Sequence, residues 1–249
     1  MNRMKNRILC YGEMLWDKFP DGAVPGGAPM NVAISLTKLG TEVSFLSSCG
    51  NDKLGENLLA YLKENGLSCQ YIQQNDYPTG VVNVNLSEKN NASYEIVFPS
   101  AWDYILIPEI LPEFDVLVYG SLSCRNKTSF ETLAALLETK ALNVFDVNFR
   151  SPHIDKATVE QLLKKADIVK MNREELFQIS GWNGLNSIDL ETAANLVIQK
   201  YAVKVLCVTL GADGAYIQRS YEKLYQNGFA VKTKDTVGAG DAFLAGFIH

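Results

Sequence analysis

Short apolar runs alternate along this sequence with longer segments of helical period. Six of the runs are predicted strands: 8–12, 43–47, 116–120, 144–148, 168–171 and 205–209. Seven of the longer segments are predicted helices: 30–39, 55–64, 128–139, 156–166, 172–179, 190–201 and 238–249. Repeated strand–helix–strand units are typical of parallel sheets, because each crossover helix covers one face of the sheet. The sequence therefore predicts an α/β fold with a mostly parallel sheet flanked by helices.

Two segments interrupt this alternation. Residues 81–86 and 93–98 are strand-like and flank a short polar turn, which leaves no room for a helix and predicts an antiparallel hairpin. Residues 14–19 are similarly short and extended. We interpret these pieces, from about 13–25 and 78–100, as a small sheet that forms a lid over a site at the strand ends. A surface hairpin with no role in a site is the alternative.

Length, charge and cysteine usage restrict the class of protein. The chain has 249 residues, which fits one domain over residues 1–249. Its net charge of −5 argues against nucleic acid as a partner. No run approaches the roughly 18 apolar residues of a membrane helix, so no membrane partner is expected. Five cysteines without a C-x-x-C pair predict reduced thiols in a cytoplasmic protein and no structural zinc.

The most informative motif is Asp235-Thr236-Val237-Gly238-Ala239-Gly240-Asp241, which opens the last predicted helix. Small residues at a helix N-terminus let main-chain N–H groups converge on an anion. Asp241 lies in the first helical turn, where a carboxylate is favoured electrostatically as a helix cap. Beside an anion site, the same carboxylate is suited to accept a proton from an attacking hydroxyl group. Both interpretations remain open at this point.

A second glycine-rich stretch, Gly26-Gly27-Ala28-Pro29-Met30-Asn31, also opens a helix. Glycines allow a ligand to approach the backbone closely, and Asn31 offers both a donor and an acceptor, as a polyhydroxylated ligand requires. A glycine turn with Asn31 as its cap is the alternative. Asp17, on the predicted lid, is a weaker candidate, because an exposed carboxylate is usually only solvated.

These two glycine-rich stretches closely resemble the two signatures of the ribokinase-like (PfkB) carbohydrate kinases. The P-loop, the G-x-G-x-x-G fingerprint after the first strand and the protein-kinase signatures are all absent. Gly12-Glu13-Met14-Leu15-Trp16-Asp17 and Asp146-Val147-Asn148-Phe149-Arg150 are most similar to the fructokinase branch, in which Pro is usual at the position of Val147.

The resemblance implies a ribokinase-like three-layer fold with a small β-sheet lid. It also implies an ATP-dependent sugar kinase with fructose as the expected sugar and, through the lid sheet, a homodimer. Ribose, 2-keto-3-deoxygluconate, a nucleoside or a sugar phosphate remain alternative substrates. A catalytically weak sugar or nucleotide sensor is the alternative from another functional class.

Roles for individual residues follow from the same resemblance. Asp241 would be the general base, and the anion hole would consist of Gly238, Ala239 and Gly240. The sugar would be bound by Asp17, Gly27 and Asn31. Arg150 could neutralise phosphate or orient the substrate, but an Arg after a strand is more often a surface residue, and we leave it out of the predicted site.

The cofactor site would draw on three further segments. Asn172-Arg173-Glu174-Glu175 resembles the N-x-x-E motif, in which Asn172 and Glu175 organise Mg²⁺, its waters and the phosphates. An ordinary acidic helix start is the alternative. Thr209, Gly211 and Gly214 match a T-x-G-x-x-G nucleotide turn, which by itself is only a glycine-bearing turn. Main-chain carbonyls near Asp235 and Val237 would hold a monovalent cation such as K⁺.

The sequence stops at His249, about two turns after Asp241. Members of the family continue for several tens of residues that complete the adenine pocket and the cation site. We therefore expect this chain to be incomplete at its C-terminus relative to the family.

Overall fold

The structure, a computed structural model, describes residues 6–86, 92–185, 189–231 and 238–249. Its centre is a nine-stranded sheet of order β13-β12-β11-β10-β9-β8-β1-β4-β5. These strands are β1 (Arg7–Tyr11), β4 (Glu42–Gly50), β5 (Ile72–Asn75), β8 (Val116–Gly120), β9 (Leu142–Asp146), β10 (Ile168–Asn172), β11 (Val205–Thr209), β12 (Gly214–Arg219) and β13 (Glu222–Asn227). Neighbours from β5 through β11 pair in parallel, whereas β12 and β13 are antiparallel additions at one edge.

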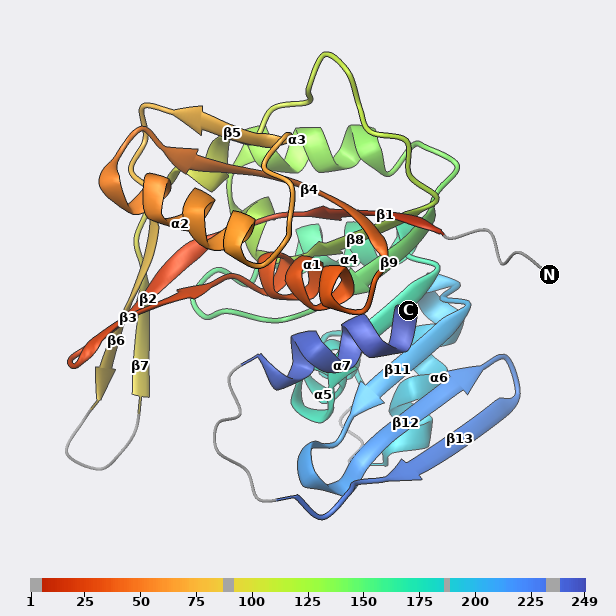
Figure 1. The fold of residues 1–249 in the computed structure, drawn as a ribbon. Helices are drawn as coiled ribbons and strands as arrows, with labels where there is room; N and C mark the ends of the chain where they lie inside the picture. Colours follow the sequence, from red (N-terminus) through yellow and green to blue (C-terminus); the bar gives the residue numbers. More distant parts are fainter. Residues whose placement is uncertain (1–5, 87–91, 186–188, 232–237) are drawn as a thin grey trace.

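Helices cover both faces of this sheet (Figure 1). They are α1 (Ala28–Lys38), α2 (Lys53–Glu64), α3 (Lys127–Leu136), α4 (Lys156–Lys165), α5 (Arg173–Trp182), α6 (Leu190–Tyr201) and α7 (Ala239–Ile248). Side chains of β1 alternate between two buried clusters: Ile8 and Cys10 pack with α1, α2 and α7, whereas Leu9 and Tyr11 pack with α3 to α6. The predicted three-layer α/β architecture is confirmed.

Local sequence explains where many of these helices begin. An Asp or Asn side chain at the N-cap accepts a hydrogen bond from a main-chain N–H group in the first turn, which satisfies a donor that the helix leaves free. The capping side chains are Asp52, Asn126, Asp155, Asn172 and Asp189. By contrast, α1 and α7 begin at glycines, Gly27 and Gly238, that have no side chain to cap them. Both of these glycine-capped helices start at the cavity described below.

A separate sheet of order β3-β2-β6-β7 projects from one side of the main sheet (Figure 1). It consists of β2 (Leu15–Phe19), β3 (Gly22–Gly26), β6 (Gly80–Leu86) and β7 (Ala92–Ile96). The predicted hairpin corresponds to β6 and β7, which pair antiparallel, and β2 pairs in parallel with β6. Buried Leu15, Val82 and Ile96 attach this sheet to the same core cluster as Trp102.

None of the helices in the described parts of the chain combines the length and the apolar character that crossing a bilayer requires.

Candidate active site

A cavity of about 870 Å³ lies where the carboxyl ends of the main-sheet strands meet the small sheet. This is the usual position of a ligand site in an open α/β sheet. The side chains and main-chain groups that line it come from both sheets, from the start of α1 and from the start of α7: Glu13, Leu15, Asp17, Phe19, Gly27, Ala28, Asn31, Val82, Tyr94, Ile96, Leu122, Asn148, Phe149, Arg150, Ser151, Pro152, Lys170, Asn172, Thr209, Gly238, Gly240 and Asp241.

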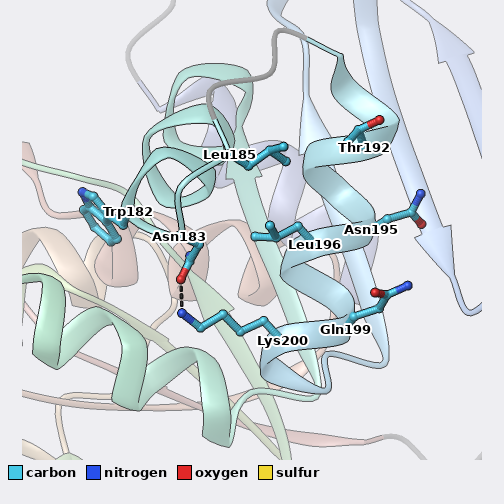
Figure 2. Close-up of a pocket in the computed structure, with 8 residues that line it drawn as sticks. All are labelled: Trp182, Asn183, Leu185, Thr192, Asn195, Leu196, Gln199 and Lys200. Atoms are coloured by element: carbon cyan, nitrogen blue, oxygen red, sulfur yellow. Dashed lines mark hydrogen bonds between the residues drawn. The ribbon is translucent and has the colours of Figure 1, made fainter.

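Figure 2 shows a second hollow, between the end of α5 and α6. Its eight lining residues are Trp182, Asn183, Leu185, Thr192, Asn195, Leu196, Gln199 and Lys200. Lys200 donates a hydrogen bond to the side chain of Asn183 and is the single ionisable group among these eight. Because acid–base or phosphoryl chemistry needs several convergent polar groups, we place the candidate active site in the cavity beside the small sheet.

Asp241 and Asn31 meet in this cavity although they are 210 positions apart in the sequence. Helices α1 and α7 pack side by side (Figure 1), and Nδ2 of Asn31 donates a hydrogen bond of 2.8 Å to Oδ2 of Asp241. The amide fixes the direction of the carboxylate and leaves its second oxygen free of this bond. A hydroxyl group in the cavity could therefore transfer its proton to Asp241.

The glycines before Asp241 line the same part of the cavity. Gly238 has a left-handed backbone with φ of 74° and precedes the first turn of α7. The N–H groups of that turn have no partner within the helix and carry its partial positive charge, as an anion site requires. Gly238 and Gly240 line the cavity, whereas the side chain of Ala239 is exposed and does not line it.

The predicted sugar-binding residues line the same cavity. A Cβ atom on Gly26 would clash with the Asp17 carboxylate, so this glycine makes room for that side chain in the small sheet. Gly27 has φ of 113°, and a Cβ atom there would lie 2.6 Å from the carbonyl oxygen of Glu13. Burial raises the pKa of Asp17, and the charge of Arg150 acts in the opposite direction. The structure thus brings Asp17, Gly27 and Asn31 to one cavity.

Asn172 and Glu175 form a capping box at the start of α5. Oδ1 of Asn172 accepts a hydrogen bond of 2.8 Å from the N–H group of Glu175, and Oε2 of Glu175 accepts one of 2.8 Å from that of Asn172. Oε1 of Glu175 accepts a third, also of 2.8 Å, from the N–H group of Phe149. Asn172 lines the cavity, and the buried Glu175 carboxylate shapes the loop that follows β9. A role for Glu175 with a metal stays a prediction.

The predicted nucleotide turn lies between β11 and β12. Thr209 lines the cavity, whereas Gly211 and Gly214 lie in the turn and are not among the residues that line the cavity. Gly214 has φ of 107°, and a Cβ atom there would clash with the carbonyl oxygen of Gln226 in β13, so the fold itself requires this glycine. The predicted cation site at Asp235 and Val237 lies outside the described residues.

Comparison with known proteins agrees with this geometry. The family model for pfkB family carbohydrate kinases matches residues 20–249. The chain belongs to the PfkB family of carbohydrate kinases. Among its relatives, probable fructokinase-4 of Arabidopsis thaliana is 32% identical over 99% of this chain and 82% of that protein. Fructokinase of Escherichia coli is 30% identical over 98% of this chain and 84% of that protein.

Solved structures give the same result. A double mutant of fructokinase from Vibrio cholerae O395, with fructose, ADP and a potassium ion bound, matches with a TM-score of 0.85 at 27% identity. The match covers 98% of this chain and 83% of that chain. The ribokinase-like fold and the sugar-kinase class predicted from the sequence are both confirmed.

Reasoning from the sequence missed two carboxylates of this PfkB kinase. Glu13, directly after β1, is 2% exposed and lines the cavity, with an Oε2 atom that has no hydrogen-bond partner among the described residues. Burial raises its pKa to about 7, and the charge of Asp241 acts in the same direction. Asp146, at the end of β9, is buried, and burial raises its pKa to about 6 against the opposing charge of Lys170. Both residues lie in segments that resemble the fructokinase branch, Gly12–Asp17 and Asp146–Arg150, but the sequence analysis gave neither of them a role.

Two cationic side chains also reach this site. Nζ of Lys170, in β10, is 2.9 Å and 3.1 Å from the two carboxylate oxygens of Asp146. Arg150, which the sequence analysis left out of the site, lines the cavity after Asn148, a non-glycine residue with φ of 41°. Asparagine tolerates this left-handed conformation, which turns the chain towards the cavity after β9.

Proposed function

We propose that this kinase transfers the γ-phosphoryl group of ATP to a hydroxyl group of fructose. The observation that carries the proposal is the Asp241 carboxylate, which Asn31 orients at the N-terminus of α7 within a cavity that also contains Asp17. The names of its relatives support fructose, since they include fructokinases that match nearly the whole chain. The bound fructose and ADP of the Vibrio cholerae protein support the pair of substrates.

In the proposed reaction, the sugar hydroxyl gives its proton to Asp241 while its oxygen attacks the γ-phosphorus. A new O–P bond forms, the bond to the bridging oxygen breaks, and ADP leaves with that electron pair. The N–H groups at the start of α7, around Gly238 and Gly240, would hold the phosphoryl oxygens. Asp17, Gly27 and Asn31 would hold the remaining sugar hydroxyl groups and so fix which one reacts.

We also propose that Mg²⁺ accompanies ATP and neutralises phosphate charge. In the described parts of the chain no three His, Cys, Asp or Glu side chains cluster closely enough to hold a metal ion by themselves. Mg²⁺ does not need such a cluster, because it is commonly bound by substrate phosphates, water and one or two carboxylates. Glu175 would act through water. We propose in addition that main-chain carbonyl groups near Asp235 and Val237 hold a K⁺ ion.

The small sheet would serve as the lid of this site, because Asp17 and Tyr94 line the cavity from β2 and β7. Closing it over the sugar would exclude water from the reaction. A homodimer through this sheet stays a prediction. All five cysteines are free thiols, which fits the proposed cytoplasmic location.

A sugar panel tests the proposed substrate. ADP release would be measured with fructose, ribose, 2-keto-3-deoxygluconate, adenosine and fructose 6-phosphate. Fructose should give the highest kcat/KM. A tenfold preference for another acceptor would overturn the choice of sugar but not the kinase class. Absence of ADP release with every acceptor, together with retained ligand binding, would favour the sensor.

A further inference from the structure

A buried ion pair lies beneath the start of α7. Lys170 and Asp146 are directly paired in the register of β10 and β9, so their side chains project from the same face of the sheet. They are 6% and 4% exposed. Among the described residues, both hydrogen bonds of the Lys170 ammonium go to Asp146, which leaves its third N–H group for another acceptor.

Stability does not explain this pair. Removing two charges from water costs several kcal/mol per ion, and apolar side chains of similar volume are often at least as stable in such a place. The position of the pair suggests a different purpose. Lys170 lines the cavity, and a Cβ atom on Gly240 would lie 3.1 Å from its Nζ atom. The glycine therefore lets the ammonium approach the main chain of the anion site.

The charges around the cavity make Lys170 important for an anionic ligand. In the described part of the chain, two cationic side chains line the cavity, Lys170 and the exposed Arg150. Three carboxylates, Glu13, Asp17 and Asp241, line it as well. A phosphoryl group that approaches Asp241 therefore meets the negative charge of Asp241 itself and of Asp17, and further negative charge whenever Glu13 is ionised. A fixed ammonium beside Gly240 would offset that charge at the point of transfer.

We propose that Lys170 is a further catalytic residue, whose ammonium contacts the phosphoryl group held at the start of α7, and that Asp146 positions it. This inference rests on the proposed kinase reaction. Lys170 neither gives nor takes a proton: the hydroxyl proton still goes to Asp241, and ADP still leaves with the electron pair of the broken bond. The ammonium stabilises the charge that builds up on the phosphoryl oxygens as the bonds exchange.

The first test separates a catalytic charge from a structural ion pair. Lys170→Met keeps the length of the side chain but leaves Asp146 buried and unpaired, whereas Asp146→Asn/Lys170→Met removes both charges. We expect the double variant to unfold within a few degrees of the wild type and to have a kcat at least 100-fold lower, with a sugar KM within about threefold. Lys204→Met, which breaks the ion pair of the exposed Lys204 with the half-buried Asp167, is the control outside the cavity and should keep full activity.

Recovery of near wild-type kcat in the double variant would overturn the proposal, because the pair would then be purely structural. Failure of the double variant to fold would also count against it, since the fold would need the charges.

The second test does not depend on turnover. Isothermal titration should show that Asp146→Asn/Lys170→Met weakens binding of ATP at least fivefold and leaves binding of ADP unchanged, because only ATP carries the γ-phosphoryl group. An equal loss for ATP and ADP, or no loss, would contradict the proposed contact. If the wild-type chain phosphorylates no sugar, the proposed function has failed, and the titration still decides whether Lys170 contacts the γ-phosphoryl group.

Discussion

The Asp241 carboxylate depends on one neighbouring side chain for its orientation. Asn31 belongs to a different helix, and its amide donates to one carboxylate oxygen at 2.8 Å. The first turn of α7 would also stabilise any acidic side chain at this position, by its partial positive charge. Proton transfer and helix capping therefore predict different consequences when Asp241 is replaced.

Replacement of Asp241 by Asn tests these two roles. Asn keeps the size of the side chain and its capping ability but cannot take the proton, so kcat should fall by about 10²–10⁴-fold while the Kd for the sugar changes much less. Steady-state kinetics and sugar titration measure the two effects, with Asp76→Asn on the exposed surface as the control. A large fall in Tm with nearly unchanged kcat would instead identify Asp241 as a structural cap.

The pKa of Glu13 predicts how stability depends on pH. Burial raises this pKa from 4.5 to about 7, so the folded chain binds the proton more tightly than the unfolded chain. The contribution of Glu13 to the free energy of unfolding should therefore decrease as the pH rises from about 4.5 to about 7, by at most about 3 kcal/mol. In Glu13→Gln, the free energy of unfolding should no longer include the decrease that Glu13 causes. Urea denaturation between pH 5 and pH 8 measures the difference.

Glu64→Gln, at an exposed position of α2, is the control for this experiment. A wild-type curve parallel to that of Glu13→Gln would show that the Glu13 carboxyl group titrates as it does in the unfolded chain.

Sequence reasoning named cavity residues that stand in glycine-rich motifs and gave no role to Lys170, whose position depends on tertiary structure. Asn31 and Asp241 follow glycines at helix starts, which is a signal within a few neighbouring positions. Lys170 is a single charged residue within an apolar strand, and its meaning depends on Asp146 in the neighbouring strand. Contacts across a sheet leave no such local signal.

At the scale of elements, the starts of α1 and α7 control the shape of the cavity. Each helix begins after a glycine with a left-handed backbone, Gly27 with φ of 113° and Gly238 with φ of 74°. Among the described residues no side chain caps the first turn of either helix with a hydrogen bond, so main-chain N–H groups can face a ligand. Larger residues would be strained at both positions because of the positive φ, and at Gly27 a Cβ atom would also clash with the carbonyl oxygen of Glu13.

Gly27→Ala tests this requirement. The new Cβ atom would lie 2.6 Å from the carbonyl oxygen of Glu13, and the backbone would be strained, so the free energy of unfolding should fall by about 1–3 kcal/mol. The KM for the sugar should rise as well, because Asn31 moves with the start of α1. Gly246→Ala is the matched control: it lies in α7 with nothing within 4 Å of the new atom, and it should raise stability slightly. Equal Tm shifts in the two variants would contradict the argument.

Sequence analysis did not predict three strands of the main sheet, β5, β12 and β13. β5 has the sequence Ile-Gln-Gln-Asn and pairs only with β4, whereas every residue of β13 is exposed. Apolar periodicity is weak in such strands, because it arises from burial. The strand β12 is largely buried between β11 and β13, and its missing prediction has no such explanation. The central strands, which are buried on both faces, were predicted to within a few residues.

At the scale of the whole molecule, the cavity joins two sheets that have separate hydrogen-bond networks. The end of β7 is anchored to the main body, where Arg125 donates to the carbonyl oxygen of Val97 at 2.7 Å and to Asp103 at 2.7 and 2.8 Å. The strands β2 and β3 belong to the part of the small sheet that projects from the main body (Figure 1). Any closure over a sugar should therefore move the small sheet more than the anchor.

Hydrogen exchange tests this closure. Saturating fructose should slow amide exchange in β2 and β3 at least severalfold, because Asp17 would bind the sugar and the sheet would open less often. The segment from Val97 to Asp103 serves as an internal control and should change little. Uniform slowing over the whole chain would indicate general stabilisation by the ligand. Unchanged exchange in β2 and β3 would argue against the lid.

The 210 positions between Asn31 and Asp241 also have a consequence for biosynthesis. At about 5–20 residues per second, a ribosome delivers Asp241 roughly 10–40 s after Asn31. Throughout that interval, the apolar surface of α1 that later packs on α7 has no partner from this chain and is open to chaperones. A nascent chain can therefore assemble much of its main sheet before Asp241, the proposed general base, has been synthesised.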